Sequence, residues 1–414
     1  MYLIDTVIVG AGQAGLAASR HLSDRGHDHV VVERGHLGQR WTTEVWDSLR
    51  LLTPNWMNEL PGWAYRGPDP HGFMTAGEFA GHLAAYARSF DAPVAEHTSV
   101  ETVRRRGDGF EVVTDRMTFG AANVVVATGW CDRPAVPAAA DHLAPDVDQI
   151  VPNAYRNPGM LADGGVLVVG ASSTGVQLAD ELRAAGRDVT LAVGNHSRLP
   201  RQYRGMDIFW WLDRIGALDK TIDHMADTDR ARYEPSLQLV GRPDRRSIDL
   251  ATLRDAGVHL VGRVSAIDGH RVAIADTLPA TVTVADNRMR RVLAEIDDHI
   301  EQHGLASEVF DPEPIPPVVV GGDVDTIDLR ANGIRSVIWA TGHRRSYPWL
   351  HIPVLDASGE IRQRRGVTPV PGLYVLGQRF QHHRRSNFIG GVGADAAVVA
   401  HHIATHRSSI VNVH

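Results

Sequence analysis

Cysteine is almost missing from this chain, since Cys131 is the only one in 414 residues. One thiol cannot form an intramolecular disulfide or a paired-cysteine redox centre, which argues against the disulfide reductases. An excess of positive charge is also missing: the formal net charge of −7 argues against nucleic acid as a partner. No apolar run reaches the roughly 18 residues of a membrane span, and Asp5 stands where a signal peptide would have a basic flank, so we expect a cytoplasmic protein.

The spacing of metal ligands is a further absence. The 22 histidines are scattered, and the adjacent pairs His382-His383 and His401-His402 lack the i, i+4 spacing of helical metal sites. We therefore expect no metal.

The length of the chain exceeds the size at which a single core usually keeps growing, which predicts two domains.

Two glycine-rich motifs are the strongest signals present. Each follows an apolar run and opens a helix-like segment; they read Gly10-Ala11-Gly12-Gln13-Ala14-Gly15 and Gly170-Ala171-Ser172-Ser173-Thr174-Gly175. Such glycines let the backbone approach a pyrophosphate, whose charge is stabilised by the N–H groups and dipole of the helix. One such turn can serve packing alone, but two in this context predict two dinucleotide sites.

The residues beyond each motif distinguish the two nucleotides. Glu33 stands 18 positions after Gly15, before Arg34, and a carboxylate there accepts hydrogen bonds from ribose hydroxyls and repels a 2′-phosphate. No acid stands at that distance after Gly175, and three arginines follow instead: Arg198, Arg201 and Arg204. Guanidinium groups suit a 2′-phosphate, although an arginine-rich surface turn is the alternative. We predict FAD in the first site and NADPH in the second.

Two Ala-Thr-Gly strands extend the pattern, at Ala127-Thr128-Gly129 and Ala340-Thr341-Gly342. In this order the motifs resemble the class B flavin monooxygenases, in which such strands link the two nucleotide domains and pass close to the cofactors. The resemblance implies an α/β fold of two Rossmann-like dinucleotide-binding domains. An NADPH-binding domain at 156–329 would be inserted into a discontinuous FAD-binding domain at 1–155 and 330–414.

Three further residues acquire roles from the resemblance. Asn55, in Thr53-Pro54-Asn55, is similar to the family's asparagine that hydrogen-bonds the oxygenated flavin or NADP, and it is our catalytic candidate; a simple turn former is the alternative. Arg40 and Trp41 resemble the family's flavin contact, although Trp41 could equally be a core residue.

The far end of the chain completes the implied flavin site. A strand ends at Gly377, and Gly391 and Val392 open a helix whose N-terminus would face the flavin. Gln378 departs from the family, which often has Asp there. The fingerprint that often precedes the second motif is missing, which weakens a Baeyer–Villiger assignment. His343 replaces a Tyr that is common after the second Ala-Thr-Gly.

The resemblance implies an FAD- and NADPH-dependent monooxygenase. It would oxygenate a small nucleophilic N- or S-containing substrate with molecular oxygen through a flavin C4a-peroxide. A homodimer is the candidate assembly. Two alternatives stay open: an NADPH-dependent flavin reductase or oxidase without oxygen transfer, and a nucleotide-sensing flavoprotein that regulates a partner.

Overall fold

A seven-stranded sheet forms the centre of the first lobe, and the apolar runs around the first glycine motif supply its buried strands. Its order is β3-β2-β1-β6-β5-β4, and β21 also pairs with β6. The strands are β1 (Tyr2–Val9), β2 (His29–Val32), β3 (Val94–Ala95), β4 (Val100–Arg106), β5 (Gly109–Thr114), β6 (Thr118–Val126) and β21 (Leu373–Val375). Strands β3, β2, β1, β6 and β21 are parallel, whereas β4, β5 and β6 form an antiparallel meander.

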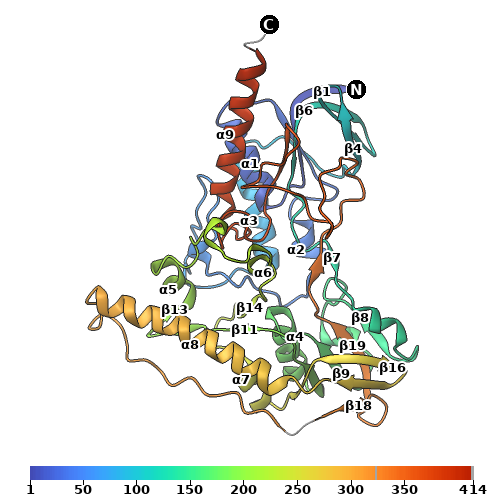
Figure 1. The fold of residues 1–414 in the computed structure, drawn as a ribbon, viewed down its shortest axis with the longest axis vertical. Helices are drawn as coiled ribbons and strands as arrows, with labels where there is room; N and C mark the ends of the chain where they lie inside the picture. Colours follow the sequence, from blue (N-terminus) through green and yellow to red (C-terminus); the bar gives the residue numbers. More distant parts are fainter. Residues whose placement is uncertain (322–323, 412–414) are drawn as a thin grey trace.

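A second, five-stranded parallel sheet forms the other lobe in the order β15-β10-β9-β19-β8. Its strands are β8 (Asp148–Ile150), β9 (Gly165–Val169), β10 (Val189–Ala192), β15 (His259–Val261) and β19 (Ile334–Trp339). Three antiparallel strands lie beside it: β16 (Val264–Asp268), β17 (Arg271–Ile274) and β18 (Thr326–Asp328). In Figure 1 the two lobes are stacked along the long axis, and strand β1 and the last helix, which ends the described chain, both lie in the first lobe.

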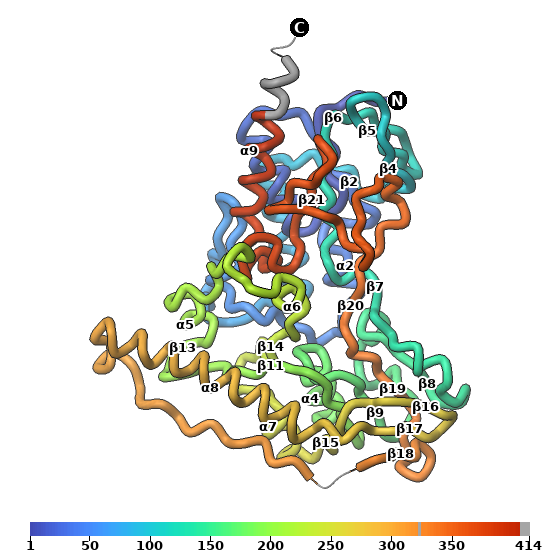
Figure 2. The backbone as a smooth tube through the Cα atoms, viewed as in Figure 1, coloured from blue at the N-terminus to red at the C-terminus, as the bar shows by residue number. Residues whose placement is uncertain are grey.

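The chain crosses between the lobes twice, at two short strands that pair with each other. These are β7 (Arg133–Pro134) and β20 (His343–Arg344), in antiparallel register. Figure 2 shows them side by side between the lobes. Strands β8 and β19 therefore belong to the inserted lobe, so the change of lobe falls near 133 and 343 instead of the expected 155 and 330.

Nine α-helices lie in the described part of the chain, which is a computed structural model of residues 1–321 and 324–411. They are α1 (Gln13–Ser23), α2 (Gln39–Thr43), α3 (Ala76–Arg88), α4 (Ser173–Ala184), α5 (Ile208–Arg214), α6 (Thr228–Arg232), α7 (Leu250–Asp255), α8 (Leu278–Gln302) and α9 (Val392–Val411). Helix α1 packs against α9 over the first sheet. None of these helices combines the length and apolarity needed to cross a bilayer.

Local sequence explains where several elements begin. Helix α3 starts at a capping box, in which the Thr75 hydroxyl accepts from Glu78 N–H and the Glu78 carboxylate accepts from Thr75 N–H. Helix α8 has Pro279 in its first turn, where a missing N–H costs nothing. The predicted α/β fold, with two Rossmann-like units and one inserted into the other, is confirmed.

Candidate functional site

One cavity of about 2090 Å³ lies between the lobes and reaches both glycine motifs. Both motifs follow the carboxyl ends of parallel strands, β1 in one lobe and β9 in the other, which is where ligands bind in open α/β sheets. The cavity joins the two turns in a single space, so two dinucleotides bound there would share it.

The first turn is shaped by the different surroundings of its glycines. Gly10 has φ +103°, and a Cβ on it would lie 2.7 Å from the Ala127 carbonyl oxygen. A Cβ on Gly15 would lie 1.9 Å from the Gly10 oxygen. At Gly12, by contrast, no described atom lies within 4 Å of an added Cβ, and no side chain caps α1 there. Two glycines therefore serve close packing, while Gly12 leaves open space at the helix N-terminus for a pyrophosphate.

Glu33 is held over this turn at the end of β2. Its carboxylate accepts from Ala11 N–H at 2.9 Å and from Gly35 N–H at 3.1 Å. Glu33 also lines the cavity, so a carboxylate faces the place where an adenosine ribose would follow the pyrophosphate. This arrangement fits a nucleotide without a 2′-phosphate.

The second turn repeats the first. Gly170 has φ +107°, and a Cβ on it would lie 2.3 Å from the Ala340 carbonyl oxygen; one on Gly175 would lie 1.8 Å from the Gly170 oxygen. Ser172 precedes α4, and no side chain makes a cap hydrogen bond there. The parallel explains both Ala-Thr-Gly segments, because Ala127 and Ala340 each place a carbonyl against the first glycine of a motif.

The three arginines predicted to hold a 2′-phosphate are already paired with acids. Arg198 contacts Asp249 at 2.7 Å and Asp286 at 2.8 Å. Arg201 pairs with Asp207 at 2.5 Å, and Arg204 pairs with Asp297 at 2.7 Å. Only Arg198 of the three lines the cavity. We therefore assign structural roles to Arg201 and Arg204.

Arg201 has a specific structural task. Its side chain is 1% exposed, and its Nη1 donates to the Leu52 carbonyl at 2.8 Å. Leu52 and Thr53 line the cavity from the first lobe. The guanidinium thus fastens the predicted monooxygenase-like segment onto the inserted lobe.

A different arginine faces the place where the phosphate was expected. Arg263 follows β15, Gly194 follows the adjacent β10, and both line the cavity. The Arg263 Nε lies 3.9 Å from the position of a Cβ on Gly194. Sequence counting missed Arg263, because it lies about 70 positions beyond Gly194 and becomes its neighbour only when β10 pairs with β15.

Asn55 does not line the cavity. Its Nδ2 donates to the Asp69 carbonyl at 2.9 Å, and its Oδ1 accepts from Met74 N–H at 2.8 Å. Asn55 is 4% exposed and holds the loop from 69 to 74 against its own segment. These contacts therefore fit a structural role for Asn55 better than the catalytic role.

Aromatic and cationic side chains form the wall near the crossing strands. Trp41 lines the cavity and packs edge-on against Phe79, with ring centroids 4.8 Å apart. Arg379 stacks over Trp130 at 5.0 Å, and burial lowers the pKa of Arg379. Trp130 and Arg379 were not among the predicted site residues, although Trp130 directly follows Ala-Thr-Gly.

Two titratable groups on this wall are kept neutral. Burial lowers the pKa of His343, whose Nε2 lies 2.9 Å from Asn153 Oδ1, and Arg40 lowers it further. Burial raises the pKa of the Cys131 thiol to about 11, although nearby Arg40 opposes the shift. A neutral thiol does not support thiolate redox chemistry here.

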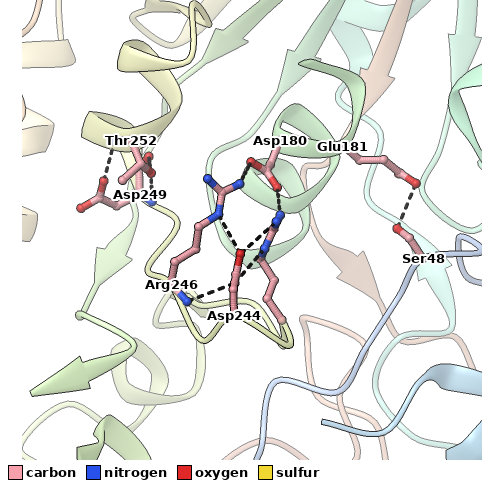
Figure 3. A network of polar contacts seen from close by, with 8 residues as sticks. Ser48, Asp180, Glu181, Asp244, Arg246, Asp249 and Thr252 are labelled. Carbon is pink, nitrogen blue, oxygen red and sulfur yellow. Dashed lines mark hydrogen bonds and ion pairs between the residues drawn. The ribbon is translucent and has the colours of Figure 1, made fainter. Parts of the chain in front are cut away.

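Contacts between the lobes hold α4, the helix of the second motif. Glu181 accepts from the Ser48 hydroxyl at 2.9 Å and from the Tyr155 hydroxyl at 3.1 Å. Figure 3 shows the Ser48 contact, together with Asp180, which pairs with Arg246. Because Ser48 belongs to the first lobe, this network fixes one glycine turn relative to the other.

Most of the predicted cofactor residues meet in the cavity. Those that line it are Gly10, Gly12, Gln13, Ala14, Glu33, Arg34, Arg40, Trp41, Thr128, Gly129, Gly170, Ser172, Ser173, Thr174, Arg198, Ala340, Thr341, Gly342 and Gly377. Those that do not line it are Gly15, Asn55, Gly175, Arg201, Arg204, Gln378, Gly391 and Val392. Asn387, Phe388 and Ile389 form the wall just before the predicted Gly391 and Val392.

Comparison with known proteins agrees with this geometry. Residues 7–210 match the family described as pyridine nucleotide-disulphide oxidoreductase. An uncharacterized CzcO-like oxidoreductase of Geobacillus kaustophilus is 32% identical, over 98% of this chain and 99% of the relative. The indole-3-pyruvate monooxygenase YUCCA1 of Oryza sativa is 31% identical, over 90% of this chain and 86% of the relative.

Solved structures share the fold. The flavin-containing monooxygenase of Stenotrophomonas maltophilia matches with a TM-score of 0.68 at 19% identity, over 98% of this chain and 99% of that one. A bacillithiol disulfide reductase of Staphylococcus aureus matches with a TM-score of 0.61 at 14% identity, over 98% and 99%. The fold and site define a flavoprotein oxidoreductase with two dinucleotide-binding units. The chain belongs to the class B flavoprotein monooxygenase-like family.

Proposed function

We propose that this protein is an FAD- and NADPH-dependent monooxygenase that transfers one oxygen atom of dioxygen to a small N- or S-containing nucleophile. The observation that carries the proposal is the single cavity lined by both glycine turns. A relative named as a monooxygenase covers most of the chain, which supports oxygen transfer in preference to electron transfer alone.

The residues present fit both cofactors. The open space at Gly12 and the carboxylate of Glu33 suit the pyrophosphate and ribose of FAD. The turn at Gly170 and the uncapped start of α4 suit the second pyrophosphate, and Arg263 suits a 2′-phosphate. When bound, the flavin supplies the redox and oxygen chemistry and NADPH supplies the hydride.

The protein's own contribution is positioning. The ties from Arg201 to Leu52 and from Glu181 to Ser48 hold the lobes at one separation, which sets how closely two dinucleotides can meet. The raised pKa of Cys131 keeps thiolate chemistry out of the wall. Oxygen transfer needs a site that excludes water, because water admitted to it diverts the reaction to peroxide.

A flavin reductase or oxidase is the second candidate, and the position of Asn55 favours it. Both polar atoms of that side chain are bound to backbone groups, and Asn55 is not among the residues that line the cavity. A regulatory flavoprotein would use the same nucleotide sites without turnover.

The test compares the fate of oxygen. Flavin-loaded protein is reduced anaerobically with NADPH and mixed with isotopically labelled dioxygen and a panel of thioethers and tertiary amines. The proposal predicts labelled sulfoxide or N-oxide and less than one peroxide per NADPH. Stoichiometric peroxide with no labelled product contradicts it in favour of an oxidase, and failure to reoxidise favours a reductase or sensor. Protein reduced with dithionite, without NADP, is the control, and it should release more peroxide.

A further inference from the structure

Two adjacent histidines and a buried aspartate meet behind the cavity wall, outside the site described above. His382 and His383 lie in the loop before α9, and Asp395 lies in its first turn. Both histidine Nδ1 atoms are 3.7 Å from Asp395 Oδ1. Their ligand atoms all lie within 4.8 Å of one another, and none of the three residues lines the cavity.

The Ser386 side chain hydrogen-bonds the Asp395 carboxylate, but one carboxylate oxygen lacks a partner. Asp395 is 1% exposed, and its Oδ2 has no hydrogen-bond partner among the described residues. A buried carboxylate oxygen without a partner is costly unless a cation or a donor reaches it. This orphaned atom is independent of the histidine geometry and indicates the same missing group.

The loop is prepared to present both imidazoles. The Ser386 hydroxyl accepts from His382 N–H at 3.0 Å and from His383 N–H at 2.9 Å. The His382 carbonyl accepts from Ile222 N–H at 2.7 Å, which anchors the loop to the inserted lobe. The two imidazole centroids lie 3.8 Å apart. The contacts with Ile222 and Ser386 hold the loop in place, so that the three candidate ligands from the loop and from α9 lie close together.

We infer that His382, His383 and Asp395 form a binding site for a divalent transition-metal ion, with zinc as the best match. Two imidazole nitrogens and one carboxylate oxygen are a donor set that zinc accepts, whereas magnesium and calcium prefer oxygen alone. Bonds of about 2.1 Å in tetrahedral geometry separate ligand atoms by about 3.4 Å. Each histidine Nδ1 lies 3.7 Å from Asp395 Oδ1, and the three ligand atoms lie within 4.8 Å of one another, so small side-chain shifts would bring them to a zinc ion. The side chains of His382 and His383 are 15% and 20% exposed, which leaves access for water as a fourth ligand.

The loop that carries both histidines also contributes to the cavity wall. The metal would join the loop to α9, and because Arg379, Phe380 and Arg384 of that loop line the cavity, it would stiffen the cavity wall.

The test is a metal titration of tag-free, chelator-treated, flavin-loaded protein. Cobalt should give the visible absorption of a four-coordinate site, and zinc should bind at one tight equivalent in competition with a chromophoric chelator and raise the melting temperature. His383→Gln and Asp395→Asn should each weaken zinc binding by more than the tenfold to about a hundredfold that follows loss of a supporting contact. Flavin content of each variant shows that the first lobe has folded.

The matched control is another pair of close histidines, His299 and His303 on α8, with ring centroids 4.0 Å apart. His299→Gln with His303→Gln should leave the tight equivalent unchanged. The inference is overturned if the unaltered protein binds no zinc at micromolar concentration. It is also overturned if binding survives both His383→Gln and Asp395→Asn, or disappears with the α8 pair. If Asp395→Asn does not fold, His383→Gln and the cobalt spectrum decide the matter alone.

Discussion

The glycines of the two motifs have different roles: some allow close backbone packing, and Gly12 leaves open space at the start of a helix. Gly10 and Gly170 have positive φ, and a Cβ on either would collide with a carbonyl oxygen of the Ala-Thr-Gly segment in the same lobe. Any side chain there therefore strains the fold. Gly12 has an ordinary φ of −75°, and its surroundings are open. Its lack of a side chain therefore matters to a ligand more than to folding.

Gly12→Ala separates these two functions. We expect a free energy of unfolding of the flavin-free protein within about 0.5 kcal/mol of the unaltered chain, and a loss of at least tenfold in flavin affinity, about 1.4 kcal/mol. Denaturant unfolding and flavin titration provide the measurements. Gly81→Ala in α3, where no described atom lies within 4 Å of the new Cβ, is the control and should keep full affinity. Unchanged affinity in Gly12→Ala would remove the pyrophosphate from this turn.

Arg263 carries the predicted preference for NADPH. Arg263→Ala should raise the KM for NADPH by about tenfold to a hundredfold, since a charge-assisted contact is worth about 1.5–3 kcal/mol, and should leave the KM for NADH nearly unchanged. Steady-state reduction with both nucleotides gives the comparison. Arg204→Ala, which breaks the pair with Asp297, is the control and should keep the preference. The reverse pattern would restore the assignment made from sequence.

Asn55→Ala should act mainly on stability. It leaves Met74 N–H and the Asp69 carbonyl without their partner, which predicts a loss of about 2–4 kcal/mol in the free energy of unfolding. Asn387→Ala, on the cavity wall, should change stability by less than about 0.5 kcal/mol. If Asn55→Ala unfolds like the unaltered protein yet releases more peroxide, the catalytic role predicted for Asn55 is correct.

Sequence spacing located the turns but could not assign the arginines. The acids that pair with Arg198 and Arg204 lie on α7 and α8, tens of residues further along the chain. A count along the sequence detects a cluster of guanidinium groups, yet only the folded chain shows whether their charge is already compensated.

At the scale of elements, α4 is held by a carboxylate that burial disfavours. Burial raises the pKa of Glu181, and the hydrogen bonds from Ser48 and Tyr155 only partly oppose this. A raised folded-state pKa means that the stability it gives is present below the unfolded pKa and is lost as pH rises through the folded value. Ionisation of the buried Glu181 therefore lowers the stability of the folded protein.

Glu181→Gln tests this sign. Glutamine cannot ionise, so the stability of the variant relative to the unaltered protein should increase as pH rises from about 4, near the unfolded pKa, towards neutrality. Loss of one hydrogen-bond acceptor adds an offset that does not depend on pH. Urea unfolding at several pH values measures the difference. A difference that falls with pH would show that Glu181 is stabilised as an anion.

Elements with strong local patterns were predictable, and those that depend on distant pairing were not. The buried runs of β1 and β9, which precede the glycine motifs, and the start of α9 agree with the expected apolar runs and helix. The crossing strands β7 and β20 have two residues each, and β8 joins the inserted sheet only by pairing with β19. The expected lobe boundaries were displaced because neither pairing has a local signal.

At the scale of the whole molecule, insertion of one Rossmann-like lobe into the other places two glycine turns around one cavity. This topology followed from the order of motifs in the sequence. The dimensions of the cavity and its wall near Trp130 and Arg379 required the fold, because they depend on how the lobes are tied at Ser48 and Leu52.

Anaerobic titration of the flavin-loaded protein with NADPH tests the shared cavity most directly. The cavity predicts that the protein binds one FAD per chain and that one equivalent of NADPH bleaches it, faster than NADH does. Gly12→Ala should bind the flavin at least tenfold more weakly, and Arg263→Ala should lose the preference for NADPH while keeping the flavin. A protein that binds no flavin, or whose bound flavin neither nucleotide reduces, would contradict the assignment of both sites to one cavity.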